Sequence, residues 1–210
     1  VLRHVDSGEG WTLSGHQPQH FTEPRMNRLT LLIAVASLVT ACSCTTVRQL
    51  KDPATLPVDG KASRTRAEKA LDYSIAIDIA AKPEVVWAVL TDAPSFKTWN
   101  TTIVSLEGSI AKDQAIKLVS KVAPDRTFDL KVTTFDAPTH MVWEDGNSMF
   151  LGVRHFTLTA KDSGTVLAMS ETYSGGMLGM IEGKLPDMTA NFETFAANVK
   201  TEAERRASTP

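Results

Sequence analysis

The sequence predicts an α+β fold in which a curved antiparallel sheet of about seven strands is covered by one long C-terminal helix. Hydrophobic and polar residues alternate over residues 73–79, which is typical of a strand with one buried face. Strand-like segments then recur about every 10–13 residues with short turns between them. An apolar stripe at helical spacing runs through the last long segment, residues 186–207.

The elements follow in a simple order. Pro83 and Glu84 suit the first turn of a helix, which we expect over residues 85–91, and a shorter helix holds Phe96. Six strands are expected over residues 103–108, 115–122, 127–135, 140–145, 153–161 and 165–174. Their short turns favour an antiparallel meander. The helix over 186–207 is the only element long enough to cover the apolar face of that sheet.

The composition excludes several classes of protein. The chain has 210 residues, 22% of them charged, with a net charge of −2 and an isoelectric point near 6.2. A nucleic-acid partner is therefore not expected, because such proteins carry a strongly basic face. Only Cys42 and Cys44 are present, and their spacing fits neither a redox nor a zinc motif. We expect no metal and no cofactor.

Residues 26–41 have the features of a secretory signal peptide. A short positive segment at Met26 precedes an uncharged stretch over residues 29–41. That stretch is too short to cross a bilayer as a helix, which takes about 20 apolar residues. Val39-Thr40-Ala41-Cys42 resembles the bacterial lipobox, which implies that Cys42 becomes the acylated N-terminus of the mature chain. The alternative is an ordinary signal peptide that ends near a cysteine.

The expected organisation follows from this signal. Residues 1–25 lie upstream of the positive segment, and we interpret them as a start-site artefact with translation beginning at Met26. Residues 42–70 carry many charges with Pro53, Pro57 and Gly60, and are expected to be the lipidated N-terminus and a flexible tether. Residues 71–207 form the folded domain. By resemblance to double-membraned bacteria, Ser43 after the cysteine indicates the periplasmic face of the outer membrane.

The order of elements resembles the START-like superfamily, also called SRPBCC, whose bacterial members include polyketide cyclase/dehydrase and lipid transport proteins. The residues that carry the resemblance are the stretch from Ala81 to Trp87, Leu90-Thr91-Asp92, Phe96, Trp99-Asn100, the stretch from Arg154 to Leu158, Gly164-Thr165 and Glu171. The resemblance implies a helix-grip fold, in which a sheet wraps around the C-terminal helix and leaves a hydrophobic cavity.

The alternation of residues along each strand then gives the side chains that face this cavity. The expected ligand-binding residues are Trp99, Phe128, Leu130, Trp143, Arg154, Phe156, Met169, Glu171, Met188, Phe192 and Phe195. For the apolar ones, plain core packing is the alternative. Arg154 and Glu171 share the parity of the apolar residues, so the register that joins the two apolar faces places them opposite each other. Their pair is either a structural ion pair or a polar anchor for a ligand.

No catalytic motif stands out in the sequence. His155 has the parity of the outer face and is expected to be exposed, and residues 174–179 are expected to form a mobile hinge at the cavity mouth. Three functions remain open: a membrane-anchored module that binds a lipid or other small hydrophobic ligand, a cyclase/dehydrase-like enzyme, and an interaction module with a filled interior. A cavity of roughly 300 Å³ or more would separate the first two from the third.

Overall fold

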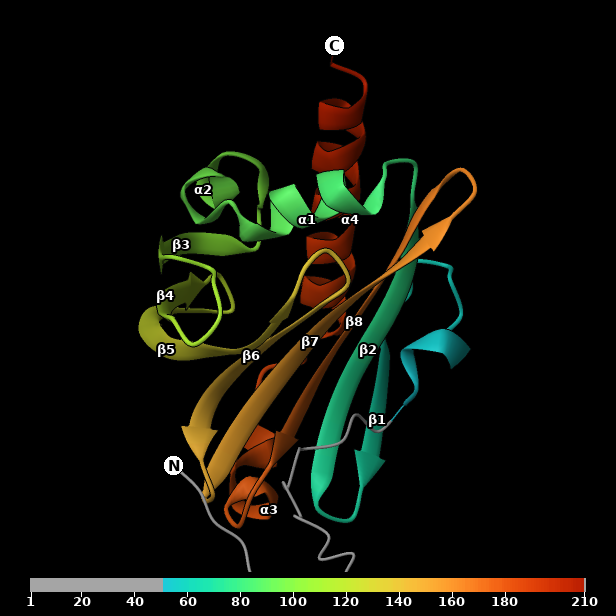
Figure 1. The fold of residues 1–210 in the computed structure, drawn as a ribbon. Coiled ribbons are helices and arrows are strands. Elements are labelled where there is room, and N and C mark those ends of the chain that lie inside the picture. The colour runs from blue at the N-terminus through green and yellow to red at the C-terminus, as the bar shows by residue number, and fades with distance from the viewer. Residues whose placement is uncertain (1–50, 210) are drawn as a thin grey trace, which may run out of the picture. The chain divides into compact units, whose positions relative to one another are not determined.

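The computed structural model describes residues 51–209, and their strands form one antiparallel sheet that wraps around helix α4 (Figure 1). The strand order is β1-β2-β8-β7-β6-β5-β4-β3. The strands are β1 (Ser63–Ala67), β2 (Ala70–Ile79), β3 (Ile103–Gly108), β4 (Ala115–Ser120), β5 (Ala123–Asp136), β6 (His140–Asn147), β7 (Phe150–Lys161) and β8 (Gly164–Ser174). The helices are α1 (Pro83–Thr91), α2 (Phe96–Trp99), α3 (Leu178–Ile181) and α4 (Thr189–Ala207). The α+β helix-grip fold expected from the sequence is confirmed.

The sheet has one strand more than expected, because part of the proposed flexible tether is ordered. Strand β1 pairs with β2 from Ser63 opposite Ser74 to Ala67 opposite Ala70. Before it, a 3-10 turn (Pro53–Thr55) leads to Leu56, which packs against Ala76 and Ala168 on the outer face of the sheet. Strand β1 is short and polar, so it carries no hydrophobic alternation that would reveal it in the sequence. The expectation of a tether over all of 42–70 is therefore wrong for this part.

Helix α4 begins three residues later than the expected start at residue 186. Pro186 and Asp187 precede it outside any helix or strand, and the Asp187 carboxylate accepts hydrogen bonds from the backbone nitrogen (2.9 Å) and hydroxyl (2.7 Å) of Thr189. These bonds satisfy one of the backbone donors that the first turn of a helix leaves free. The chain before α4 is consequently available to cover the concave side of the sheet.

The apolar stripe of α4 packs into the concave face of the sheet. The ring of Phe195 lies 6.1 Å from that of Phe156 and 6.3 Å from that of Phe96, between centroids. One turn earlier, the ring of Phe192 lies 6.1 Å from that of Tyr73. The other buried positions of the stripe are Ala196, Val199 and Ala203. This packing fixes one long wall of the interior.

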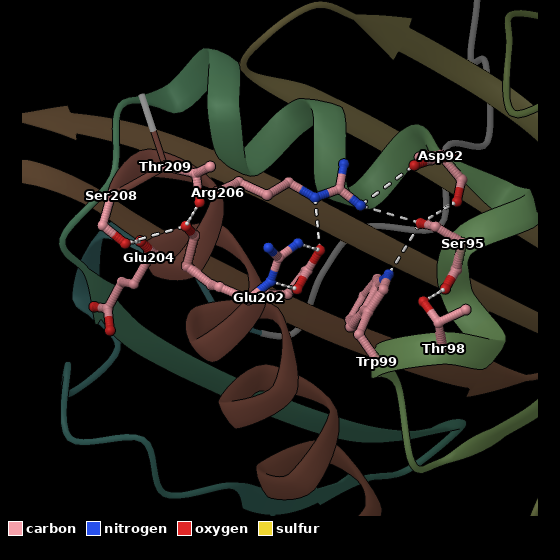
Figure 2. A network of polar contacts seen from close by, with 10 residues as sticks. Asp92, Ser95, Thr98, Trp99, Glu202, Glu204, Arg206, Ser208 and Thr209 are labelled. Carbon is pink, nitrogen blue, oxygen red and sulfur yellow. Dashed lines mark hydrogen bonds and ion pairs between the residues drawn. The ribbon is translucent and has the colours of Figure 1, made fainter.

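The C-terminal end of α4 is joined to the segment around α2 by a network of polar side chains (Figure 2). Arg206 donates hydrogen bonds to Asp92 (3.3 Å), Ser95 (3.2 Å) and Glu202 (2.7 Å). The indole nitrogen of Trp99 donates to the same Ser95 hydroxyl at 3.1 Å. The network holds the end of the helix against α2. Within residues 51–209, no helix is long and apolar enough to cross a membrane.

Candidate functional site

A cavity of about 360 Å³ lies between the concave face of the sheet and α4 with the chain that precedes it. Its volume exceeds the roughly 300 Å³ at which ligand sites begin. The lining residues are Thr102, Ile103, Leu118, Ser120, Val122, Ala123, Arg126, Phe128, Leu130, Trp143, Asp145, Phe150, Gly152, Arg154, Glu171, Tyr173, Lys184, Leu185, Pro186, Met188, Asn191 and Phe195. Most of them are aliphatic or aromatic, as in sites that take apolar ligands.

The structure brings most of the expected ligand-binding residues together. Those that line the cavity are Phe128, Leu130, Trp143, Arg154, Glu171, Met188 and Phe195. They come from strands β5, β6, β7 and β8, from the residue just before α4 and from α4 itself. The alternation of residues along the strands therefore predicts the correct face at each of these positions.

Four expected residues do not line the cavity. Trp99 packs on Phe96, with ring centroids 4.7 Å apart, and belongs to the network at the end of α4. Phe156, Met169 and Phe192 have the predicted orientation but are fully enclosed in the core, at most 2% exposed. Strand parity gives the face that a side chain occupies, but not how far along the strand the open volume extends.

The only ion pair expected from the sequence lies in the cavity wall. Arg154 is directly opposite Glu171 in the register of β7 and β8, and its Nε donates to Glu171 Oε2 at 3.1 Å while Nη2 donates to the same oxygen. The guanidinium also lies 5.2 Å from the ring centroid of Phe192. Burial is the largest single effect and acts against the charge on Arg154, but the Glu171 carboxylate and Tyr173 together raise the pKa of the guanidinium. Arg154 therefore stays charged.

Among the polar residues of the lining that sequence reasoning missed are Tyr173, Asp145 and Arg126. Tyr173 stands two residues after Glu171 on β8, and its ring stacks on Phe150 with centroids 5.7 Å apart. Asp145 stands two residues after Trp143 and lies 3.6 Å from Arg126, an N–O distance. Burial raises the pKa of Tyr173 well above that of an exposed tyrosine, and the charge of Glu171 adds to this. Tyr173 has the same parity as Glu171 on β8, and Asp145 the same parity as Trp143 on β6. Continuing the alternation two residues further along each strand would have found both.

His155 is not exposed, although it lies on the outer face as predicted. It is 7% exposed, between the cross-strand neighbours Val142 and Ser170. The ring of His140 stacks on it, and His140 Nε2 lies 3.3 Å from His155 Nδ1. Burial, with a contribution from His140, lowers the pKa of His155 to about 4. Flanking side chains on neighbouring strands bury this position, which alternation within one strand does not report.

Two further expectations concern the chain outside the cavity. Residues 174–179 link β8 to α3, where the Met177 nitrogen donates to the Met149 carbonyl at 2.8 Å. This stretch contributes no side chain to the lining, so it does not form the cavity mouth as expected. Within residues 51–209, no group of three or more histidine, cysteine or acidic side chains is placed to hold a metal ion.

The fold and the cavity together define a helix-grip protein with an internal space of ligand size. A family model described as "Polyketide cyclase / dehydrase and lipid transport" matches residues 70–204, and the chain belongs to this family. No curated protein matches the sequence.

Solved structures similar to this chain share its fold at low sequence identity. A conserved protein of unknown function from Enterococcus faecalis has a TM-score of 0.52 at 17% identity, over 71% of this chain and 81% of that one. A protein of unknown function from Staphylococcus aureus has a TM-score of 0.53 at 12% identity, over 67% and 98%. The di-domain ARO/CYC protein StfQ of the steffimycin biosynthetic pathway has a TM-score of 0.54 at 15% identity. The match covers 67% of this chain and 53% of StfQ.

Proposed function

We propose that this protein is a membrane-anchored envelope lipoprotein whose helix-grip domain binds a lipid or other small hydrophobic molecule in its cavity. The single observation that carries the binding function is the largely apolar cavity of about 360 Å³ beneath α4. A protein interior is normally packed to crystal-like density, with few voids larger than a water molecule. A largely apolar space of this size is stabilised when a ligand of matching chemistry fills it.

The volume argues against an interaction module with a filled interior. Side chains that could fill the space, such as Phe156 and Phe192, lie elsewhere in the core. Gly152 instead faces the cavity, where a larger residue would reduce it. The chain thus keeps the space open at a position where the strand geometry would accept a side chain.

A cyclase- or dehydrase-like enzyme is the second candidate function. The observation that favours it is the convergence of Arg154, Glu171 and Tyr173 on the cavity, because such reactions need positioned groups that give and take protons. Two features weigh against it. The raised pKa of Tyr173 makes this hydroxyl a poor base near neutral pH, and Glu171 is engaged by Arg154. Binding without chemistry therefore fits the arrangement better.

Native mass spectrometry of the purified full-length protein tests the binding function. We expect a small apolar molecule to copurify with the protein, and Gly152→Leu to remove it. Gly152 is not among the glycines with a positive φ, and a Cβ there would meet the ring of Tyr173 at 3.5 Å, an ordinary contact distance. The leucine should therefore fill the cavity without strain. Gly179→Leu is the matched control, because that position in α3 faces open space.

Three outcomes of this experiment are informative. Loss of the ligand in Gly152→Leu and its retention in Gly179→Leu support binding in the cavity. Retention in both variants, or no ligand in the unmodified protein even after incubation with extracted lipid, contradicts it. If the molecule released from the unmodified protein is the dehydrated form of the one released from Glu171→Gln, the enzyme is the correct function.

The anchoring half of the proposal depends on Cys42, which lies outside the described residues. It is supported by the lipobox-like sequence Val39-Thr40-Ala41-Cys42. Attachment of several acyl chains would hold the domain stably at a bilayer, since each buried methylene contributes about 0.8 kcal/mol. Cys42→Ser should abolish incorporation of labelled fatty acid, and Cys44→Ser should not. Fractionation of the cell envelope would then test the expected location on the periplasmic face of the outer membrane.

A further inference from the structure

We infer that the cavity selects a single-chain or single-ring ligand with an uncharged hydrogen-bonding head, such as a hydroxyl or a carbonyl, and rejects carboxylates and amines. This inference rests on the proposed binding function and adds the chemical class of the ligand. It assigns to the Arg154–Glu171 pair the role of setting that class.

The charges in the deep wall of the cavity compensate each other. Arg154 and Glu171 form a direct ion pair, with side chains only 13% and 14% exposed. Nearer the surface, Asp145 is paired with Arg126 at 3.6 Å, and the Arg126 side chain is 59% exposed. Among the described lining residues, the remaining charged group is Lys184, which is exposed on the chain before α4. The deep wall therefore offers no free charge to a charged ligand.

A charged head would be penalised twice in this surrounding. It would lose its hydration, which costs several kcal/mol for an ion in a protein interior. A carboxylate would also be near Glu171 and Asp145, and an ammonium near Arg154. In the deep wall each would meet a charge that already has a partner, so the attraction it gains there is too weak to offset the hydration it loses.

A neutral polar head finds both a donor and an acceptor. Both hydrogen bonds from Arg154 end on Oε2 of Glu171, so Oε1 keeps capacity to accept from a ligand hydroxyl. Oε1 lies on the side of Gly152, 3.8 Å from the place a Cβ would occupy there. Tyr173 keeps its proton because its pKa is raised, and its uncharged hydroxyl is already hydrogen-bonded to Glu171. The donor for a ligand carbonyl is therefore one of the Arg154 N–H groups that Glu171 does not use. A hydroxyl or carbonyl head can be satisfied here without displacing either ion pair.

The size of the cavity limits the apolar part of the ligand. About 360 Å³ is close to the lower end of the roughly 300–1,000 Å³ range of ligand sites. This suits one acyl chain or one small ring system rather than a lipid with two chains. The aromatic side chains of Phe128, Phe150 and Trp143 in the wall suit either.

Competition against the uncharged dye Nile red, with the full-length protein at pH 7, tests the inference. The probes are decan-1-ol, decanoate and decylammonium, which share one chain and differ in the charge of the head. We expect the alcohol to displace the dye at a concentration about tenfold or more below that needed for either ion, a difference worth about 1.4 kcal/mol. Preference for decanoate or for decylammonium overturns the inference and leaves the binding function standing.

Two variants should reverse the selectivity in opposite directions. Glu171→Gln leaves Arg154 uncompensated and should shift preference towards decanoate by about tenfold. Arg154→Gln leaves Glu171 uncompensated and should shift it towards decylammonium. Asp78→Asn is the matched control: it makes the same acid-to-amide change in the exposed pair with Lys161, outside the cavity, and should leave the order unchanged.

The remaining outcomes test either the inferred class of ligand head or the proposed binding function. Unshifted selectivity in a folded Glu171→Gln or Arg154→Gln protein overturns the role of the pair. If a variant does not fold, the order of the three probes on the unmodified protein still decides the class of head. Binding of Nile red without displacement by any probe overturns the inference, whereas no binding of dye or probes overturns the proposed function itself.

Discussion

Arg154 on β7 and Glu171 on β8 face each other directly, and their ion pair is built into the wall of an otherwise largely apolar cavity. Both side chains are largely shielded from solvent, so each charge is compensated by the other and not by water. The pair also lies against the ring of Phe192, which the guanidinium approaches to 5.2 Å. Losing one member is therefore expected to cost more than losing both.

Arg154→Met should destabilise the protein by about 3–5 kcal/mol, the usual cost of leaving one member of a buried pair without its partner. The double variant Arg154→Met/Glu171→Leu should recover much of that loss, because it removes both charges. Unfolding in urea measures the free energies. Lys161→Met, in an exposed pair with Asp78, should change the free energy of unfolding by less than about 1 kcal/mol. A double variant less stable than Arg154→Met would contradict this interpretation.

Phe192 and Phe195, both expected to border the cavity, should now behave differently. Phe192 is 1% exposed and lies outside the lining, so Phe192→Ala should leave a new void and cost about 3–5 kcal/mol. Phe195 already has open space on one side, and Phe195→Ala loses fewer contacts.

We therefore expect Phe195→Ala to cost at least about 1 kcal/mol less than Phe192→Ala, while weakening Nile red binding more. Unfolding in urea and dye titration on the same two proteins measure both effects. Equal losses of stability would show that the two rings are packed alike, and would place the open volume elsewhere.

Much of the fold and of the site was predictable because it depends on local periodicity. Alternation along β7 and β8 predicts that Arg154 and Glu171 share the face of Phe156 and Leu167, and burial of that face admits a single register. The pairing follows without any knowledge of the structure. The apolar stripe of α4 likewise identifies the element that the sheet grips.

The features that could not be predicted depend on depth and on distant neighbours. Phe156 and Phe195 have the same apolar character, yet only Phe195 borders the cavity, and the periodicity of a strand or helix does not report where the open volume lies. Strand β1 is a polar edge strand fixed by backbone hydrogen bonds to β2, which hydrophobic patterns do not encode. The burial of His155 depends on the side chains of neighbouring strands in the same way.

The buried histidine predicts a loss of stability in mild acid. The pKa of His155 is lowered from 6.5 to about 4 by burial and by His140. Between these two values the unfolded chain binds a proton that the folded protein does not, so stability falls as the pH decreases from 6.5 towards 4. His155→Gln should flatten the dependence of Tm on pH in this window. His140→Gln should also flatten it, because it removes both the smaller cause of the shift at His155 and the lowered pKa of His140 itself.

An acidic residue at the end of α4 gives a pH dependence of the same sign in a lower pH range. Glu202 accepts hydrogen bonds from Arg205 at 2.8 Å and from Arg206 at 2.7 Å. Arg206 also donates a hydrogen bond to Asp92 (Figure 2). The bonds from Arg205 and then from Arg206 lower the pKa of Glu202 from 4.5 to about 2. The ionised carboxylate therefore contributes to stability.

That contribution should be complete above pH 4.5 and should disappear as the pH falls from 4.5 to about 2, because the unfolded chain takes up a proton there first. Glu202→Gln should lower Tm at pH 7, and its Tm should fall less steeply than that of the unmodified protein between pH 4.5 and 2. Glu107→Gln, at an exposed position of β3, is the matched control and should leave the slope unchanged. Thermal unfolding followed by circular dichroism across this range measures all three proteins. If the Tm of Glu202→Gln falls with pH in parallel with that of the unmodified protein, the loss of stability in acid comes from other carboxylates. The network at the end of α4 then does not contribute to it.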